Sequence, residues 1–247
     1  MRALIYYNMK HHKDRDYYRT LTLRTIGNFM ILSSLFMIGK TFYQPVREEV
    51  RYLSEKQSQK EYIVAQDEQE AAEIVKRDFG SVAEKGALKE LLKKENVGIL
   101  IPTDPNFSIV IPKIAANAPV VPNINAGDRE EYLEALQTGV AHAEGTAFPG
   151  EGGHIYMFAH STDYVWNVGT YNAVFYLLYK LEIGDEINLF YKGQRFLYRV
   201  TGKEIIDPDQ VDYITRKTDK EFLTLQTCWP PGTTLKRQMI FAERVVE

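Results

Sequence analysis

Hydrophobic residues in this chain of 247 residues are grouped in two different ways. Near the N-terminus they form one uncharged run from Thr25 to Gly39. From Val97 onward they occur as short runs separated by Pro, Gly and polar residues. The first pattern predicts one long apolar helix, and the second predicts a series of short β-strands joined by turns.

The N-terminal run is shorter than the roughly 20 residues that a membrane span prefers. Lys40 can lie at the boundary and extend its ammonium toward water, with Phe42 and Tyr43 in the interface. The alternatives are a signal-peptide core and a buried soluble helix. Because the residues after the run are not small, a cleavage site is not indicated, and we expect a retained anchor over residues 25–45.

Charge around the run predicts the orientation of the anchor. Basic residues outnumber acidic ones in residues 1–24, and basic segments tend to stay on the cytoplasmic side. We therefore expect a cytoplasmic tail over residues 1–24. The protein would be a single-pass protein of the cell membrane, with the bulk of the chain extracellular.

Residues 46–97 are rich in Glu, Lys, Gln and Ala, with charges of both signs. Ala65–Asp78 and Ala87–Glu95 contain strong helix formers and few breakers. The pattern predicts a solvated, partly helical stalk. The alternative is an appendage that packs over an active groove and regulates access to it.

The remaining residues, 98–247, have the sequence pattern of a β-protein, with short apolar runs separated by turn residues. The strands and the short amphipathic helix that we expect are Val97–Ile101, Ser108–Ile111, Arg129–Val140 (helix), His154–His160, Glu186–Tyr191, Arg195–Glu204, Phe222–Thr227 and Met239–Val246. Lys192-Gly193-Gln194 is a hairpin signal between two of them. Many short strands, frequent turns and few long helices predict a mainly β closed barrel or sandwich.

Composition narrows the function only slightly. The net charge is −3, so a basic footprint for nucleic acid is not indicated. Hydrophobic residues make up 45% of the chain, which is ample for a core. One cysteine excludes an internal disulfide and leaves the redox compartment open.

That single cysteine, Cys228, is the strongest chemical candidate. A lone cysteine is most often a small buried hydrophobe. Cys228, however, stands where a strand meets the loop Pro230-Pro231-Gly232, and Arg237 opens the next strand. If the two strands pair antiparallel, the end of the first lies beside the start of the second. A thiol next to a permanent cation is a plausible nucleophile, because the thiolate is the reactive form.

The run Thr224-Leu225-Gln226-Thr227-Cys228, followed by Arg237, resembles the signature of the sortase family, bacterial cysteine transpeptidases. Ile155–Ser161, which contains His160, matches the family's histidine segment, and Gly139–Gly150 is also similar. The resemblance covers about residues 99–246 and implies a sortase-type closed β-barrel. One departure is visible, since this chain has Gly153-His154 where many members have Gly-Asn.

The resemblance also implies a reaction and its participants. Cys228 would be the nucleophile, His160 the acid and base, and Arg237 the electrostatic clamp, with Thr227 and Trp229 as candidate substrate-binding residues. The substrates would be surface proteins with a C-terminal Leu-Pro-x-Thr-Gly-like sorting signal. A thioester acyl-enzyme would pass them to an amine of cell wall or of another, pilin-like subunit. No cofactor or metal is expected.

Two other functions compete with this one. L,D-transpeptidases are also β-rich cysteine enzymes, but their motif places His and Gly just before Cys and Arg two residues after it, which the residues around Cys228 do not match. A non-enzymatic, membrane-tethered extracellular β-domain with a buried cysteine also fits. His142, just before the glycine-rich loop, is interpreted as structural. The sorting motif, the acceptor amine, the sortase class and calcium dependence stay open.

Overall fold

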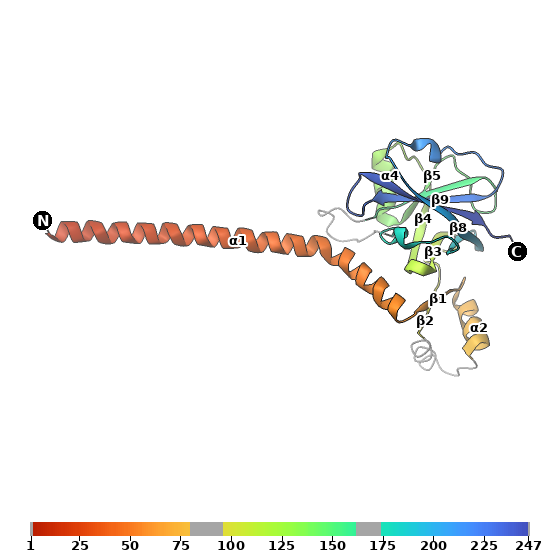
Figure 1. Cartoon of the computed structure of the whole chain (residues 1–247), viewed down its shortest axis with the longest axis horizontal. Helices are drawn as coiled ribbons and strands as arrows, with labels where there is room; N and C mark the ends of the chain where they lie inside the picture. The colour runs from red at the N-terminus through yellow and green to blue at the C-terminus, as the bar shows by residue number, and fades with distance from the viewer. Residues whose placement is uncertain (1, 80–95, 162–173, 247) are drawn as a thin grey trace. The chain divides into compact units, whose positions relative to one another are not determined.

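The computed structural model describes residues 2–79, 96–161 and 174–246, with side chains from residue 15 onward. The chain forms two compact units, Met1–Val46 and Arg47–Glu247. The first consists of most of one helix, and the second contains all the strands. Figure 1 shows the elements in chain order.

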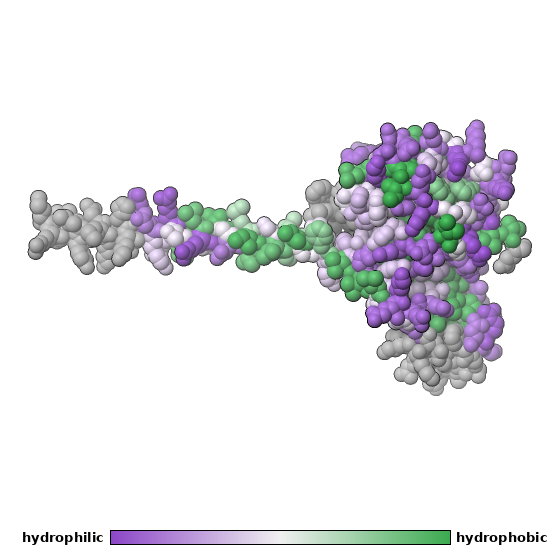
Figure 2. All heavy atoms as spheres, viewed as in Figure 1, coloured by the Kyte–Doolittle hydropathy of each residue, from purple (hydrophilic) through white to green (hydrophobic). Residues whose placement is uncertain are grey.

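Helix α1 (Arg2–Gln57) contains the apolar run. Its described part is long and apolar enough to cross a membrane, and the apolar stretch is not buried. Large hydrophobic side chains from Leu21 to Ile38 are exposed, and Figure 2 shows them gathered along the helix. A helix that is apolar around its circumference and unburied is typical of a segment that faces lipid.

The β-rich half of the chain closes into a barrel of eight strands in the order β10-β8-β7-β3-β4-β5-β6-β9. The strands are β3 (Phe107–Ile111), β4 (Ala116–Ile124), β5 (Val140–Ala143), β6 (His154–Phe158), β7 (Glu186–Tyr191), β8 (Gln194–Ile206), β9 (Phe222–Trp229) and β10 (Lys236–Arg244). The predicted closed barrel is confirmed.

Short helical elements connect or cover the strands. They are η1 (Pro112–Ile114), α4 (Arg129–Thr138), η2 (Leu178–Lys180) and η3 (Val211–Tyr213). The amphipathic helix predicted over residues 129–140 is α4. Asp128 caps it, because its carboxylate accepts the backbone N–H groups of Glu130 and Glu131.

The hairpin predicted around Lys192-Gly193 joins β7 to β8. Tyr191 pairs with Gln194, so the turn has two residues. Both have positive φ, 50° for Lys192 and 74° for Gly193, which is the geometry of a type I′ turn. This turn matches the right-handed twist of the strands, and its glycine removes the steric cost at one of the two positions.

Strand β4 is not predicted by the local sequence, because Pro119 and Pro122 interrupt it. The strand forms because two different neighbours hydrogen-bond to it, each over a different part of its length. It pairs antiparallel with β3 up to Pro119 and parallel with β5 from Val120, with a register shift between Val121 and Ile124. Prolines are tolerated where the ladder is irregular, since no backbone donor is needed there.

The stalk segment contains more than helix. Helix α2 (Glu68–Phe79) agrees with the helix predicted over Ala65–Asp78, whereas the one predicted over Ala87–Glu95 lies outside the described residues. The strands β1 (Glu61–Val64) and β2 (Val97–Leu100) form a separate parallel pair. Arg195 of β8 donates to the carbonyl of Val64 over 3.1 Å, so this small sheet is attached to the barrel wall.

The barrel core consists of the side chains that alternate inward along the strands. On β6 and β9 these include Ile155, Met157, Leu223 and Leu225, which are all fully buried. The residues between them leave the sheet on its other face, because successive side chains in a strand point to opposite sides. This second face, over β6, β9 and β10, carries the candidate functional site.

Candidate functional site

Strands β9 and β10 bring Cys228 and Arg237 together. The two residues are direct partners in the antiparallel register, as the sequence predicts. Paired residues leave a sheet on the same side, so the thiol and the guanidinium project from one face. Arg237 is braced by its own loop, because Nη1 donates to the carbonyls of Thr234 and Lys236, each over 3.1 Å.

His160 follows β6, which runs parallel to β9 on its other side. Phe158 is the partner of Gln226, and the next residue, Ala159, still donates its backbone N–H to Gln226 over 3.1 Å. Continuing this register by two residues places His160 level with Cys228. With strands about 4.8 Å apart, the backbone positions of His160, Cys228 and Arg237 form one row about 10 Å long.

The two candidate substrate-binding residues, Thr227 and Trp229, alternate with Cys228 along β9 and so leave the strand on the opposite face. Thr227 is buried, with 4% of its surface exposed, and its hydroxyl donates to the carbonyl of Ala159 over 2.9 Å. This bond ties β9 to the backbone just before His160, so the hydroxyl positions the site from within the protein. Trp229 is half-buried at the end of β9 and packs against Tyr179, with ring centroids 5.2 Å apart.

Sequence reasoning missed Tyr156 and Gln226, which lie on the same face as the row. The Tyr156 hydroxyl donates to Gln226 Oε1 over 2.5 Å. Burial raises the pKa of Tyr156, and the positive charge of Arg237 partly offsets this effect. The charge of Arg237 therefore acts across the face and not only on Cys228. The alternation of side chains between the two faces of β6 and β9 is the sequence signal that could have predicted that Tyr156 and Gln226 share a face.

The environment of Cys228 favours the neutral thiol in the resting protein. Burial raises the pKa of the thiol above its ordinary value, and the positive charge of Arg237 offsets only part of the rise. The cation alone therefore does not produce a resting thiolate, contrary to the simplest expectation from the sequence. A thiol that is neutral at rest reacts only after it loses its proton, and the continued register places the backbone of His160 beside Cys228.

We expect alkylation of native Cys228 by iodoacetamide to accelerate with a midpoint above the pH of about 8.5 that is ordinary for cysteine. The reason is that only the thiolate reacts, and the raised pKa delays its formation. In Arg237→Gln the midpoint should move higher still, because the offsetting charge is lost. The rate would be measured by intact mass between about pH 6 and 10.

The matched control for that experiment is Lys236→Gln. This change removes the adjacent cation of β10, whose ammonium lies 2.5 Å from Asp207 Oδ1. Its midpoint should stay close to that of the unchanged protein. A midpoint at or below about 8.5 in the unchanged protein would contradict the burial argument.

The other two described histidines with buried rings have structural surroundings. His142 Nδ1 accepts the backbone N–H of Asn123 over 3.3 Å, and Nε2 lies 3.0 Å from Thr146 Oγ1. His154 Nε2 lies 2.8 Å from Thr224 Oγ1. Burial lowers the pKa of His154 to about 4, and the positive charge of Arg216 contributes. Both rings are therefore held by polar contacts within the barrel wall, and the structural role of His142 stays a prediction.

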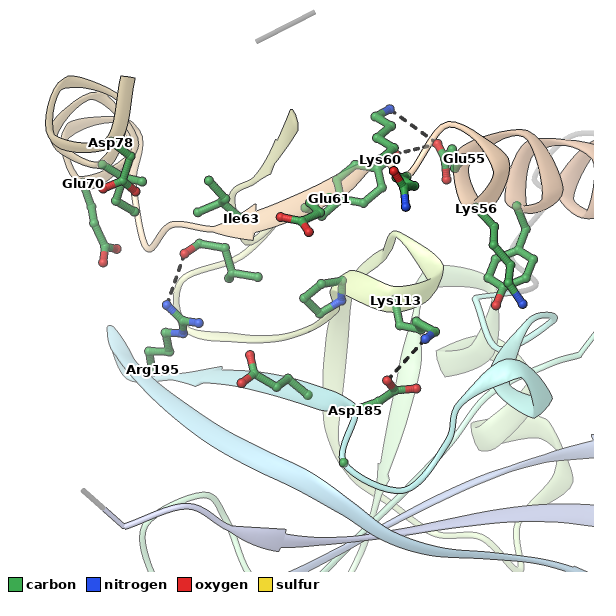
Figure 3. A pocket seen from close by; sticks show the side chains of 18 of the residues that line it. Glu55, Lys56, Lys60, Glu61, Ile63, Glu70, Asp78, Lys113, Asp185 and Arg195 are labelled. Atoms are coloured by element: carbon green, nitrogen blue, oxygen red, sulfur yellow. Dashed lines mark hydrogen bonds and ion pairs between the residues drawn. The ribbon is translucent and has the colours of Figure 1, made fainter. Parts of the chain in front are cut away.

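A pocket of about 810 Å³ lies elsewhere on the same compact unit, between the end of α1, β1, α2 and the barrel. Figure 3 shows Lys113 and Asp185 pointing toward each other on one wall, 3.6 Å apart, and Arg195 directed at β1. Its lining carries acidic and basic residues in similar numbers and includes none of the row. Among the described residues, no group of three or more His, Cys, Asp or Glu side chains could hold a metal ion.

Comparison with known proteins gives a consistent result. A family model for the sortase domain matches residues 109–245, which is more than half of the chain. Sortase D of Bacillus subtilis (strain 168) is 33% identical over 138 residues, which are 55% of this chain and 61% of that relative. The chain thus spans less than two thirds of this relative.

Solved structures of sortases are also similar to the chain. A lid mutant of Streptococcus agalactiae sortase C1 is 26% identical, with a TM-score of 0.48, over 57% of this chain and 68% of the other. A Clostridium perfringens sortase D5 transpeptidase is 23% identical, with a TM-score of 0.46, over 72% of this chain and 98% of the other.

Proposed function

Because the chain belongs to the sortase family, we propose that it is a membrane-anchored cysteine transpeptidase whose nucleophile is Cys228. The observation that supports the proposal is the direct pairing of Cys228 with Arg237, together with the β6–β9 register, which brings His160 level with Cys228 when it is continued past the end of β6. These three residue types supply a nucleophile, an acid and base, and a fixed positive charge, which are the groups that acyl transfer needs.

In the first half-reaction, Sγ of Cys228 attacks the carbonyl carbon after Thr in a Leu-Pro-x-Thr-Gly-like sorting signal. His160 takes the thiol proton and gives it to the leaving amine, so the C–N bond breaks and a thioester remains. In the second half-reaction, the acceptor amine attacks the thioester carbonyl and the C–S bond breaks. The proton of the amine returns through His160 to the thiol. The covalent intermediate divides one amide exchange into two easier steps.

Arg237 is assigned to the oxyanion that forms in each half-reaction. A guanidinium has five N–H donors and keeps its charge at any relevant pH. Two backbone carbonyls already orient it from behind, through Nη1. A preorganised cation stabilises the transition state more than the ground state, because it does not have to reorganise when the charge develops.

The apolar helix α1 supports a location at the cell membrane, with residues 1–24 in the cytoplasm and the barrel outside. Substrates would be surface proteins held at the same membrane by their C-terminal segments. The acceptor would be an amine of cell wall or of another, pilin-like subunit. An anchored enzyme meets such substrates at a high effective concentration.

The test is mass spectrometry of the full chain mixed with a library of short sorting peptides that vary around Leu-Pro-x-Thr-Gly. We expect a mass increase equal to the N-terminal peptide fragment, removable by hydroxylamine and mapped to Cys228. Iodoacetamide labelling of the native and the denatured protein shows whether the thiol is accessible. No adduct with any peptide, together with a thiol that reacts only after denaturation, would favour the non-enzymatic tethered domain.

A further inference from the structure

The residue directly after the nucleophile is supported by an aromatic ring from another element. The indole of Trp229 packs on Tyr179 of η2, with ring planes inclined by 54°. Because side chains alternate along β9, Trp229 leaves the strand on the face opposite to Cys228. The contact with Tyr179 therefore fixes the end of the strand that holds the thiol without covering the thiol's own face.

Tyr179 is in turn held by a charged residue of α1. Its hydroxyl donates to Glu49 Oε1, and Lys180 Nζ lies 3.1 Å from Glu49 Oε2. The same ammonium stands over the Tyr179 ring, 4.7 Å from the centroid. Burial raises the pKa of Tyr179, and its hydrogen bond to Glu49 raises it further, so the phenol stays a donor.

Glu49 belongs to the last turns of α1, which form one compact unit with the barrel. Two neighbouring residues add further attachments. Tyr52 is buried in the barrel core with 8% of its surface exposed, and Arg51 donates to the carbonyl of Ile114 over 3.1 Å. These contacts fix the helix at several points, so Glu49 presents its carboxylate from a rigid support.

We propose that Tyr179 is a positioning residue for the Cys228 site, held in place by Glu49 at the end of α1. Glu49, which follows the apolar run, would then support the Cys228 site indirectly, through Tyr179 and Trp229. The inference rests on the proposed transpeptidase function but is independent of the sorting motif. Glu49 would be needed for full activity even though it does not touch the substrate.

The first experiment measures thioester formation by the full chain carrying Tyr179→Leu, Tyr179→Phe or Glu49→Ala. Tyr179→Leu should lower kcat about tenfold with KM little changed, because a misplaced nucleophile loses rate more than substrate binding. Tyr179→Phe keeps the aromatic ring that packs on Trp229, so its kcat should lie between those of the unchanged protein and Tyr179→Leu. The double variant Glu49→Ala/Tyr179→Phe should match Glu49→Ala alone, since the hydrogen bond that Tyr179→Phe removes is already lost in Glu49→Ala.

The matched control is Glu48→Ala. Glu48 is the preceding acidic residue on the same helix, and its carboxylate pairs with Arg51 over 2.7 Å instead of reaching Tyr179. Its kinetics should equal those of the unchanged protein. If Tyr179→Leu does not fold, as judged by thermal unfolding, the pair Tyr179→Phe and Glu49→Ala decides the question.

Two readouts separate this inference from the proposed function. Trp229 emission is followed in a Trp166→Phe background, where it is the only indole. Iodoacetamide labelling of Cys228 reports the thiol's geometry without acyl transfer. We expect Tyr179→Leu and Glu49→Ala to change both, and Glu48→Ala to change neither. A folded Tyr179→Leu protein with unchanged emission and labelling would overturn the inference, even if no sorting peptide reacts.

Discussion

Cys228→Ala is expected to abolish the thioester adduct completely while the barrel stays folded. The chain has no second cysteine that could substitute, and the acyl group needs a nucleophile in this position. The backbone pairing of β9 with β10 does not depend on the sulfur. Transfer to an amine should fall by on the order of 10³-fold or more, as measured by product formation with a reactive sorting peptide.

Thermal unfolding is the control for that variant. The lost sulfur contacts should lower stability by about 1 kcal/mol at most, because the side chain is only partly buried. Cys228→Ser provides a second comparison, since it keeps a polar nucleophile of similar shape but lacks a readily formed anion. An adduct of undiminished yield in Cys228→Ala would show that the acyl group goes elsewhere, and the proposed mechanism would then fail.

The pairing of Cys228 with Arg237 could be predicted from sequence because it is local. A strand, a Pro-Pro-Gly loop and a second strand allow few arrangements other than an antiparallel pair, and such a pair places the two strand ends side by side. The register then follows from the loop length. The pKa of the thiol could not be predicted in this way, because burial by distant segments outweighs the nearby charge.

The position of His160 depends on a contact that is remote in sequence. Strand β6 pairs parallel with β9, and a parallel pairing requires a long connection that local patterns do not specify. The family resemblance supplied His160 as a site residue, whereas the residues alone predicted only a strand over His154–His160. The bond from Thr227 to Ala159 likewise becomes visible only when the two strands are placed together.

The contact of α1 with η2 could not be predicted from the sequence either, because it is also remote along the chain. Glu49 stands in a charged stretch that is typical of a solvated helix, and Tyr179 in an aromatic run that is typical of a core. The contact joins residues 130 positions apart. Strand β2 agrees with the strand predicted over Val97–Ile101, but β1 and its pairing with β2 were not predicted, because β1 has only four residues and the segment between the two strands is rich in helix formers.

Arg237→Lys is expected to lower kcat/KM for thioester formation by about 100-fold while leaving the pKa of Cys228 almost unchanged. Lysine keeps the positive charge, so its effect on the thiol is largely preserved. It loses the planar fork, so it cannot bond the loop carbonyls of Thr234 and Lys236 and also face an oxyanion in a fixed geometry. The rate would be measured with one sorting peptide at several concentrations.

Comparison with Arg237→Gln separates the two roles of the residue. Gln lacks the charge, so this variant should lose rate and also shift the alkylation midpoint of Cys228 upward. If charge alone mattered, Lys would restore both the rate and the midpoint. If the fork stabilises the oxyanion, Lys restores only the midpoint. Lys236→Gln is the control for Arg237→Gln, because it removes the same amount of charge from the neighbouring position. Wild-type rates in Arg237→Lys would show that the guanidinium geometry has no part in the mechanism.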